Sequence, residues 1–380
     1  EFDASEGLGF SKTLSAVAEG PEWDDAGSRA GTGDRMRKAS LGEITLEVAP
    51  KSAEQGFDER GNPLADKRKI QAQKQGGPKK EHMQFGAIHS CCFDPSGQVL
   101  LTSSHDTSYA LRSSETGQVL NEPIRGHSAA VHAARFHPEG HLMATASADK
   151  LLKIWNMESG RMMHRLIAHA EAVTDTAFTP TGCLLASTSL DHSILVWDVE
   201  SGRELMRMPP GFGHELPVRC VAASPQNHVI CTGGDDAFVR VWDLRSKQLI
   251  RKLISHTRNI NSCAFSADGS CIITGSEDFS ARLWDLNGGL VHTFESDSSS
   301  VKGTCFTPSG RHIIVGRSDR HVVVYNAGSL QEVGRWVCQS ACQSVAATTQ
   351  YGGVVACGDS SGTTYVLRSV LAPCGQWRYF

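Results

Sequence analysis

Short runs of apolar and β-branched residues, separated by turn residues, follow one another along most of the chain. One stretch begins with the run at residues 173–178, passes through a Pro-Thr-Gly turn to the run at 184–187, and ends with the run at 194–197. Short runs of this kind bounded by Gly, Pro, Asp or Ser are typical of β-strands. The hydrophobic pattern therefore predicts an all-β chain of short strands.

The strand pattern repeats along the chain. Four segments end in a Trp-Asp or Trp-Asn pair, at Trp155, Trp197, Trp242 and Trp284. An aspartate lies six residues before each tryptophan, and a histidine lies 22 residues before each aspartate. The aspartates are Asp149, Asp191, Asp236 and Asp278, and the histidines are His127, His169, His214 and His256. A period of about 40–45 residues with four strands per unit is typical of a propeller blade.

Three weaker copies extend the repeat in both directions. The aspartate recurs as Asp106, Asp319 and Asp359, the tryptophan is replaced by Arg112, Tyr325 and Tyr365, and the histidine is replaced by Gln84, Asp297 and Val337. Seven copies predict an all-β, seven-bladed β-propeller over residues 83–371, with residues 372–380 as a C-terminal tail or closing strand. The three weak blades are expected to be the least stable part of the ring.

These repeated residues resemble the WD-repeat β-propeller family. The resemblance covers residues 83–371 and rests on Gly126-His127, Gly213-His214, the turn aspartates and the Trp-Asp pairs. In that family a His, a Ser or Thr, an Asp and a Trp form a hydrogen-bonded structural tetrad within one blade, which satisfies buried polar groups. The matching tetrads here are His127, Thr145, Asp149, Trp155; His169, Ser187, Asp191, Trp197; His214, Thr232, Asp236, Trp242; and His256, Thr274, Asp278, Trp284.

The resemblance also implies how the ring closes. The family usually pairs a strand from one terminus with strands from the other, so that no sheet edge stays open. Residues 44–48, 79–83 and 376–380 are the candidates for that strand, and the sequence does not choose among them.

Residues 1–82 share none of the periodicity. They are expected to form a low-order N-terminal extension that is acidic at first and basic from Arg60 onward. The basic segment at residues 67–80 is either a solvated linker or a nuclear localisation signal. Because the chain begins with Glu1 rather than Met, it stays open whether it is a fragment of a larger protein.

Composition and charge narrow the class of protein. Hydrophobic residues make up 40% and charged residues 21%, which fits a soluble globular protein. A net charge of −4 gives no electrostatic footprint for nucleic acid or an anionic membrane, and no apolar run approaches the roughly 20 residues that span a bilayer. Most cysteines, such as Cys220 and Cys263, lie in strand-like runs. Free thiols in a reducing compartment are therefore expected, with a cytoplasmic location and the nucleus as the alternative.

The sequence offers no motif for catalysis or for a cofactor. Residues 7–13 faintly resemble a phosphate loop, but no glycine precedes Lys12. Zinc-protease and Cys-x-x-Cys motifs are absent from the sequence. A His, Asp and Ser or Thr set that occurs in four blades indicates structure, because an enzyme needs one site. The chain is therefore predicted to be non-catalytic, with no cofactor and no metal.

Partner binding is expected on one rim of the propeller. In the WD-repeat family, partners often dock on the face that carries the entry to each innermost strand and the turn beside the blade aspartate. The residues that reach this face lie three and five positions after the histidine and one before the aspartate. The candidate partner-binding residues are Arg219, Asp235, Glu277, Asn259, Asn261, Leu190, His132 and Lys302, and the weak blades also contribute His89, His105, Ser318 and Ser340. Because His89, His105 and His132 fall on neighbouring blades, a metal-binding or pH-sensitive contact is an alternative there.

Residues 229–245 are similar to the box by which some propellers attach to the adaptor of a cullin ubiquitin ligase. Its key feature is Trp242-Asp243-Leu244-Arg245, and the resemblance makes Arg245 a bidentate contact outside the blade. The main hypothesis is nevertheless a non-catalytic scaffold or adaptor that binds other proteins on the rim. The alternatives are a substrate-recognition subunit of a ubiquitin ligase, a subunit of an RNA-processing or chromatin complex, and the sensor domain of a larger signalling ATPase.

Overall fold

Seven antiparallel sheets make up the part of the chain that the structure describes. The structure is a computed structural model, and it describes residues 84, 86–208, 213–226, 228–296, 298–348 and 353–368. Its regular structure there consists of 26 β-strands arranged as seven sheets. The predicted all-β, seven-bladed propeller is therefore confirmed. The low-order extension at residues 1–82, the tail at 372–380 and the three candidate closing strands lie outside the described residues.

Each sheet is one blade, and we number the blades one to seven in chain order. Blades one and seven have three described strands and the others have four, paired in sequence order from the inside outward. Blade one contains β1 (Ile88–Phe93), β2 (Val99–Ser104) and β3 (Tyr109–Ser113); blade two contains β4 (Val131–Phe136), β5 (Leu142–Ser147), β6 (Leu152–Asn156) and β7 (Met162–Leu166); blade three contains β8 (Val173–Phe178), β9 (Leu184–Ser189), β10 (Ile194–Asp198) and β11 (Glu204–Arg207).

The remaining blades follow the same plan. Blade four contains β12 (Val218–Ala223), β13 (Val229–Gly234), β14 (Phe238–Asp243) and β15 (Gln248–Ile254); blade five contains β16 (Ile260–Phe265), β17 (Cys271–Ser276), β18 (Ser280–Asp285) and β19 (Leu290–Glu295). Blade six contains β20 (Val301–Phe306), β21 (His312–Arg317), β22 (His321–Asn326) and β23 (Glu332–Val337); blade seven contains β24 (Cys342–Thr348), β25 (Val354–Asp359) and β26 (Thr364–Arg368). None of the described residues form a helix with the length and apolarity that a membrane crossing needs.

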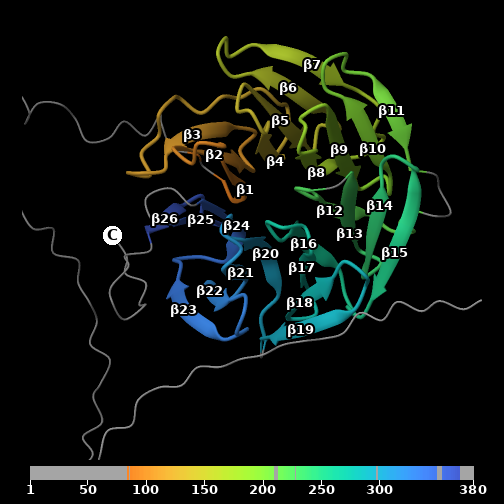
Figure 1. Cartoon of the computed structure of the whole chain (residues 1–380). Helices are drawn as coiled ribbons and strands as arrows, with labels where there is room; N and C mark the ends of the chain where they lie inside the picture. The colour runs from red at the N-terminus through yellow and green to blue at the C-terminus, as the bar shows by residue number, and fades with distance from the viewer. Residues whose placement is uncertain are drawn as a thin grey trace, which may run out of the picture. The chain divides into compact units, whose positions relative to one another are not determined.

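The blades are arranged in a closed ring. Figure 1 shows the innermost strands β1, β4, β8, β12, β16, β20 and β24 around the centre, and each contacts the next, including β24 with β1. The core lies between neighbouring sheets, as where Ile154 of blade two packs in one cluster with Leu185 and Trp197 of blade three. The same packing joins the ends of the ring, because Ile88 of blade one clusters with Ala356 of blade seven. Among the described strands, no sheet includes strands from both ends of the chain.

Burial differs between the middle and the outermost strands of a blade. Every residue of β5 is buried, because a middle strand is covered by the blades on both sides, whereas the outermost strand β7 is mostly exposed. The turn after each middle strand holds one residue in the left-handed region, which in blade two is Lys150 with φ 70°. A non-glycine residue there costs about 1 kcal/mol or more, and the blade aspartate offsets this cost: Asp149 Oδ1 accepts the N–H of Leu151 at 3.1 Å.

The structure corrects the predicted alignment of the seventh repeat. The left-handed turn residue of blade seven is Gly362, and Cys342 pairs with Asp359 as Val131 pairs with Ser147. Ser361 and Leu367 therefore occupy the aspartate and tryptophan places, two residues after the predicted Asp359 and Tyr365. The prediction was wrong because it carried the spacing of the other repeats forward, whereas strand register is fixed by hydrogen bonding and shifts when a connection changes length.

Candidate functional site

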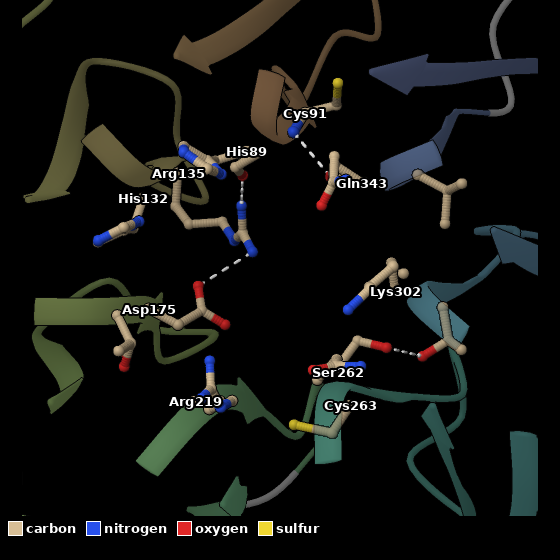
Figure 2. A pocket seen from close by; sticks show the side chains of 17 residues that line it. His89, Cys91, His132, Arg135, Asp175, Arg219, Ser262, Cys263, Lys302 and Gln343 are labelled. Atoms are coloured by element: carbon tan, nitrogen blue, oxygen red, sulfur yellow. Dashed lines mark hydrogen bonds and ion pairs between the residues drawn. The ribbon is translucent and has the colours of Figure 1, made fainter. Parts of the chain in front are cut away.

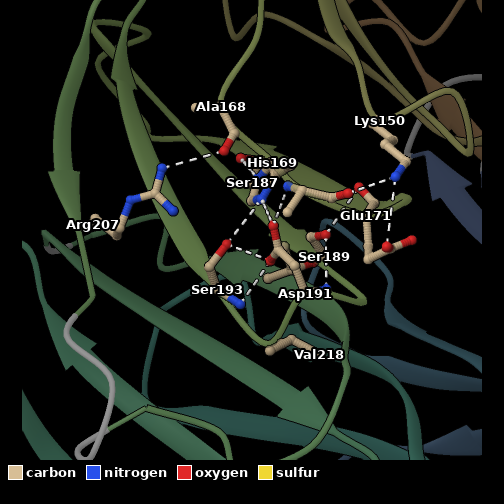
Figure 3. Close-up of polar contacts among 12 residues, drawn as sticks. Lys150, Ala168, His169, Glu171, Ser187, Ser189, Asp191, Ser193, Arg207 and Val218 are labelled. Carbon is tan, nitrogen blue, oxygen red and sulfur yellow. Dashed lines mark hydrogen bonds and ion pairs between the residues drawn. The ribbon is translucent and has the colours of Figure 1, made fainter.

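The four strong blades each contain a hydrogen-bonded tetrad. In blade two, His127 Nδ1 lies 2.9 Å from Asp149 Oδ2, His127 Nε2 lies 2.8 Å from Thr145 Oγ1, and Trp155 Nε1 donates to Thr145 Oγ1 at 2.9 Å. Figure 3 shows His169 of blade three with its partners Ser187 and Asp191. The three corresponding contacts in blades three, four and five measure 2.8 to 3.2 Å. These are the contacts that the family resemblance implies.

Burial and neighbouring charges determine which groups of a tetrad carry a proton. Burial lowers the pKa of His127, against the raising effect of Asp149, so the imidazole is neutral at pH 7. Burial by itself raises the pKa of Asp149, but hydrogen bonds from the Ser128 N–H and from His127 outweigh it and hold that pKa below its usual range. The neutral imidazole then donates from Nδ1 to the carboxylate and accepts at Nε2 from the hydroxyl of Thr145. The hydroxyl oxygen accepts the indole N–H, so every member is satisfied inside the blade.

A satisfied tetrad has no group left for a substrate. Thr145 and Ser187 are fully buried, and the four tetrad histidines are at most 7% exposed. In blade four the pKa of Asp236 falls to about 2, because the effects of His214 and Arg240 exceed the raising effect of burial. A carboxylate held ionised in this way orients an imidazole and stabilises a turn, and it stays out of reach of solvent. The tetrads therefore act as structural parts of the blades.

Blade one has a substitute for the tetrad that the sequence analysis missed. Gln84 takes the place of the histidine, and its Oε1 accepts the hydroxyl of Thr102 at 2.8 Å. Arg112, at the tryptophan place, donates to Gln84 Oε1 at 3.4 Å and to Thr102 Oγ1 at 3.5 Å. Gln84 Nε2 reaches Ser108 Oγ at 3.4 Å, which in turn donates to Asp106. The available signal was the constant spacing of Gln84, Thr102, Asp106 and Arg112, read without requiring the usual residue types.

Blade seven replaces the polar pair by thiols. The corrected register puts Cys338 at the histidine place and Cys357 at the Ser/Thr place, and their sulfur atoms lie 3.6 Å apart. Both are buried, and Cys342 Sγ lies 3.0 Å from Cys357 Sγ. No disulfide joins any of the eleven cysteines in the described ranges. Thiols behave here as small hydrophobic groups. That the weak blades are the least stable stays a prediction.

Seven side chains, one from each blade, converge on one mouth of the central channel. We define the channel mouth by these residues, which line a cavity of about 130 Å³. They are His89, His132, Thr174, Arg219, Asn261, Lys302 and Gln343. Figure 2 shows His89, His132, Arg219, Lys302 and Gln343 around the cavity. Six of these positions follow the predicted spacing. The seventh is Gln343, which lies five residues after Cys338 at the corrected histidine place. The predicted rim residue Ser340 does not line this cavity.

Paired charges lie around part of the channel mouth. Arg219 is hydrogen-bonded to Asp235 through both Nε and a terminal nitrogen, and Asp235 raises its pKa above the usual value. Lys302 is bonded to Glu277 and holds the pKa of that carboxyl below its usual range. Asn261 donates to the carbonyl of Val301 at 2.8 Å. One ion pair thus lies within blade four, and the other joins blades five and six.

The other candidate rim residues lie beside these pairs. The backbone N–H of the residue before each blade aspartate donates to the carbonyl of the residue three after the histidine, as in Leu190 to Ala172 at 3.0 Å and Glu277 to Asn259 at 2.9 Å. This bond places both positions of a blade at the same sheet edge. Leu190 and Asn259 are half-buried there.

Two histidines, His89 and His132, lie on the opposite part of the channel mouth, and His105 lies beside His89. His89 Nε2 lies 3.3 Å from His105 Nδ1, and the rings of His89 and His132 are 5.2 Å apart. Burial, followed by the charges of His132 and His105, lowers the pKa of His89 to about 4. The ring of His89 is therefore neutral at pH 7. The three histidines are not among the sets of three metal-ligand groups that come within 4.8 Å of one another in the described ranges.

Below the channel mouth lies a partly buried ion pair that the sequence analysis missed. Arg135 donates to Asp175 Oδ1 at 3.1 Å and also to Ser90 Oγ, while Asp175 Oδ2 accepts the N–H of Val221 at 3.1 Å. The contacts link the innermost strands β1, β4, β8 and β12 in succession, and Figure 2 shows the Arg135–Asp175 bond. The signal was present: other repeats have Ala or Cys at the place of Arg135, and small residues at the place of Asp175.

Arg245 lies on the turn between β14 and β15, at the end of the blade away from the channel mouth. Its backbone N–H donates to Asp243 Oδ1 at 2.9 Å, and Ser246 Oγ donates to the other oxygen of that carboxylate. The aspartate therefore caps the turn. The side chain of Arg245 is exposed.

The repeats match a known family. Residues 79–109, 117–156, 160–198, 207–243, 247–285 and 288–326 match the model described as "WD domain, G-beta repeat", and together they make up more than half of the chain. The chain belongs to this family. The family model stops before blade seven, where thiols replace the polar tetrad positions.

Several curated proteins are similar to parts of the chain. The small ribosomal subunit protein RACK1 of Neurospora crassa is 47% identical over 60 residues, which are 15% of this chain and 19% of that protein. The U3 small nucleolar RNA-associated protein 15 homolog of Gallus gallus is 29% identical over 122 residues, 32% of this chain and 23% of that protein. The periodic tryptophan protein 2 homolog of Schizosaccharomyces pombe is 27% identical over 110 residues, 28% and 13% of the two chains. The match thus spans less than a quarter of each relative.

Proposed function

We propose that this chain is a non-catalytic scaffold that holds protein partners at the channel mouth. The observation that carries the proposal is the contrast between two sets of polar residues. The His, Ser or Thr and Asp groups of the tetrads are buried and satisfied by one another, whereas one residue from every blade reaches the open channel mouth. Relatives named for a ribosomal subunit and for a small nucleolar RNA support a role in assemblies of several molecules.

The charges of the channel mouth favour a partner with a complementary pattern of both signs. The Arg219–Asp235 and Lys302–Glu277 pairs are partly exposed, with side-chain exposures between 17% and 41%. Exposed pairs contribute little to folding, but charge complementarity across an interface governs partner choice and association rate. Arg219 is the member of this set whose residue type is enriched among interface hot spots.

Exchanging the two charges of one pair is expected to abolish partner binding without unfolding the protein. In Arg219→Glu/Asp235→Lys the two side chains still attract each other, whereas a partner meets each charge in the wrong place. Affinity purification of the full chain from a cell extract, with quantification by mass spectrometry, should show at least a tenfold loss of a discrete set of proteins.

A matched control uses a pair on the outside of blade three. Glu204 and Arg207 form an ion pair on β11 at 3.1 Å, so Glu204→Arg/Arg207→Glu makes the same exchange away from the channel mouth. This control should retain the partners. Equal recovery of every protein by the wild type and by the channel-mouth variant would rule out the proposed binding face.

Attachment to a cullin ubiquitin ligase is the second candidate function. It is favoured by the exposed side chain of Arg245 on a turn that Asp243 fixes from within, because an arginine of this kind can bind a carboxylate in a bidentate manner. In the same purification, Arg245→Ala should lose the ligase adaptor and keep the channel-mouth partners. Undiminished recovery of the adaptor, or its absence from the wild-type sample, would remove this candidate.

The remaining proposals concern the cellular setting. A cytoplasmic location is proposed, with the nucleus and an RNA-processing complex as the alternative. The relative named for a ribosomal subunit supports the cytoplasmic setting, and the relative named for a nucleolar RNA supports the nuclear one. The basic segment at residues 67–80, which bears on nuclear import, lies outside the described residues.

A further inference from the structure

The turn from β4 to β5 carries two histidines and a glutamate within five residues, His137-Pro-Glu139-Gly-His141. It lies at the far end of β4 from the channel mouth. One potential ligand atom from each of these side chains lies within 4.8 Å of the other two. The same side chains line a cleft of about 420 Å³ together with Cys183, Asp198 and Glu200 of blade three. The cleft is thus rich in groups that bind metal ions.

The separations match those around a small metal ion. His141 Nδ1 lies 3.5 Å from Glu139 Oε2, and the rings of His137 and His141 are 4.4 Å apart and steeply inclined. Ligand atoms about 2.0–2.2 Å from a tetrahedral zinc ion lie roughly 3.3–3.6 Å from one another. Two of the three groups therefore have the required separation already, and the third is within a small side-chain movement of it.

The environment of His137 suits a metal ligand. Its Nε2 faces Gly182 of blade three, with whose backbone the ring is hydrogen-bonded in a way that favours a protonated nitrogen. Nδ1 is then the unprotonated nitrogen. Its lone pair accepts the N–H of Glu139 at 3.1 Å, and a bound metal ion would replace this hydrogen bond. Histidines that bind metals commonly donate their other N–H to a backbone carbonyl.

Comparison with the other turns shows that a histidine is not needed for folding here. The corresponding residue is Ser224 in blade four and Asp94 in blade one, and each accepts the N–H two residues later as His137 does. A serine would therefore cap this turn equally well. The imidazole adds a potential metal ligand beside two others, and no other turn in the described ranges holds such a set of three.

We propose that His137, Glu139 and His141 bind a divalent transition-metal ion of the zinc class. Two imidazoles and one carboxylate are ligands that Zn²⁺, Ni²⁺ and Cu²⁺ all accept. Three protein ligands leave a fourth position on the cleft side for water or for a side chain of a partner. The ion would hold the two ends of the β4–β5 turn together, on the blade-two side of the cleft. The proposal is independent of binding at the channel mouth, which is at the other end of β4.

Calorimetric titration of the full chain with Zn²⁺ in the presence of a non-thiol reductant tests the proposal. The wild type should bind one more equivalent of Zn²⁺ than His137→Ser, which keeps the turn cap, and than His141→Asn. Glu139→Gln should weaken the same site at least tenfold. Zn²⁺ should also raise the thermal unfolding midpoint of the wild type more than that of His137→Ser, because a ligand that binds only the native state stabilises it.

A matched control is available in blade four. His228 occupies the place of His141 in its own turn, and its carbonyl accepts the N–H of Leu244 as that of His141 accepts the N–H of Met157. The control His228→Asn should leave the stoichiometry unchanged. The same stoichiometry and affinity in the wild type, His137→Ser and His141→Asn, or a wild type that binds no Zn²⁺ at micromolar concentrations, would overturn the proposal.

Discussion

Replacing Trp242 with alanine is expected to destabilise the propeller by about 3–5 kcal/mol, the range for a buried large aromatic residue. Trp242 is 1% exposed and packs in one cluster with Val221 and Ile230. Its indole N–H donates to Thr232 Oγ1 at 2.9 Å, so the variant also leaves the blade-four tetrad without its last donor. The apparent free energy of unfolding, from urea denaturation followed by circular dichroism, measures the effect.

Two further variants separate packing from hydrogen bonding. Trp242→Phe keeps most of the apolar volume and removes the N–H, so it should cost less stability than the alanine variant. About 1–3 kcal/mol of its cost should come from the hydroxyl oxygen of Thr232, which loses the hydrogen bond that it accepts. Leu290→Ala removes a large apolar residue that is 46% exposed on β19, and it should change stability by roughly 0.5 kcal/mol or less. A Trp242→Ala variant with the unfolding midpoint of the wild type would contradict the structural role of the tetrads.

Removing Arg135 alone is expected to cost about 3–5 kcal/mol, because it leaves a buried carboxylate without its counter-ion. The side chain of Asp175 is 13% exposed and that of Arg135 is 31% exposed, so the loss of stability should lie at the lower end of this range. Burial already raises the pKa of Asp175 against the effect of Arg135 and two backbone N–H groups. Without Arg135 that pKa should rise further. The unfolded chain then ionises more readily than the folded one at neutral pH, so the loss of stability in Arg135→Ala should shrink as pH falls from 7 to 5.

The double variant Arg135→Ala/Asp175→Ala is the matched control. It gives β4 and β8 the small residues found elsewhere, such as Ala177 at the first place and Ala133 at the second. The double variant should be more stable than Arg135→Ala alone, and its stability should depend less on pH. Additive losses for the two single variants, determined by urea denaturation at pH 7 and pH 5, would show that the two charges do not act as a pair.

The fold could be predicted from the sequence because the same residue types recur at the same spacing in successive repeats. Each blade buries the same positions, so the interval from His127 to Asp149 recurs wherever the same hydrogen bonds are made. Four strong copies established the unit and three weak ones completed the count of seven. The rim positions followed from the same spacing, which is why His132, Arg219 and Lys302 lie together at the channel mouth.

The parts that could not be predicted are those where one blade departs from the common pattern. In blade seven the aspartate and tryptophan places shifted by two residues and the histidine place by one. Its tetrad places hold Cys338 and Cys357, which leave no polar residue to fix the alignment. The Arg135–Asp175 pair depends on two strands from different blades, and only the folded ring shows that they meet. A metal site at residues 137–141 could not be predicted, because these residues match no standard motif and their proximity depends on a turn conformation. Whether they bind metal stays a proposal.

The central claim is that seven sheets close into a ring through contact between blades one and seven. An experimental structure of the full chain, by crystallography or electron cryomicroscopy, tests it most directly. We expect β24 beside β1, with the N–H of Cys91 within hydrogen-bond reach of Ser344 Oγ, and Gly358 packed against Ile88. An open stack, or a ring with six or eight blades, would contradict the account and displace every residue assigned to the channel mouth.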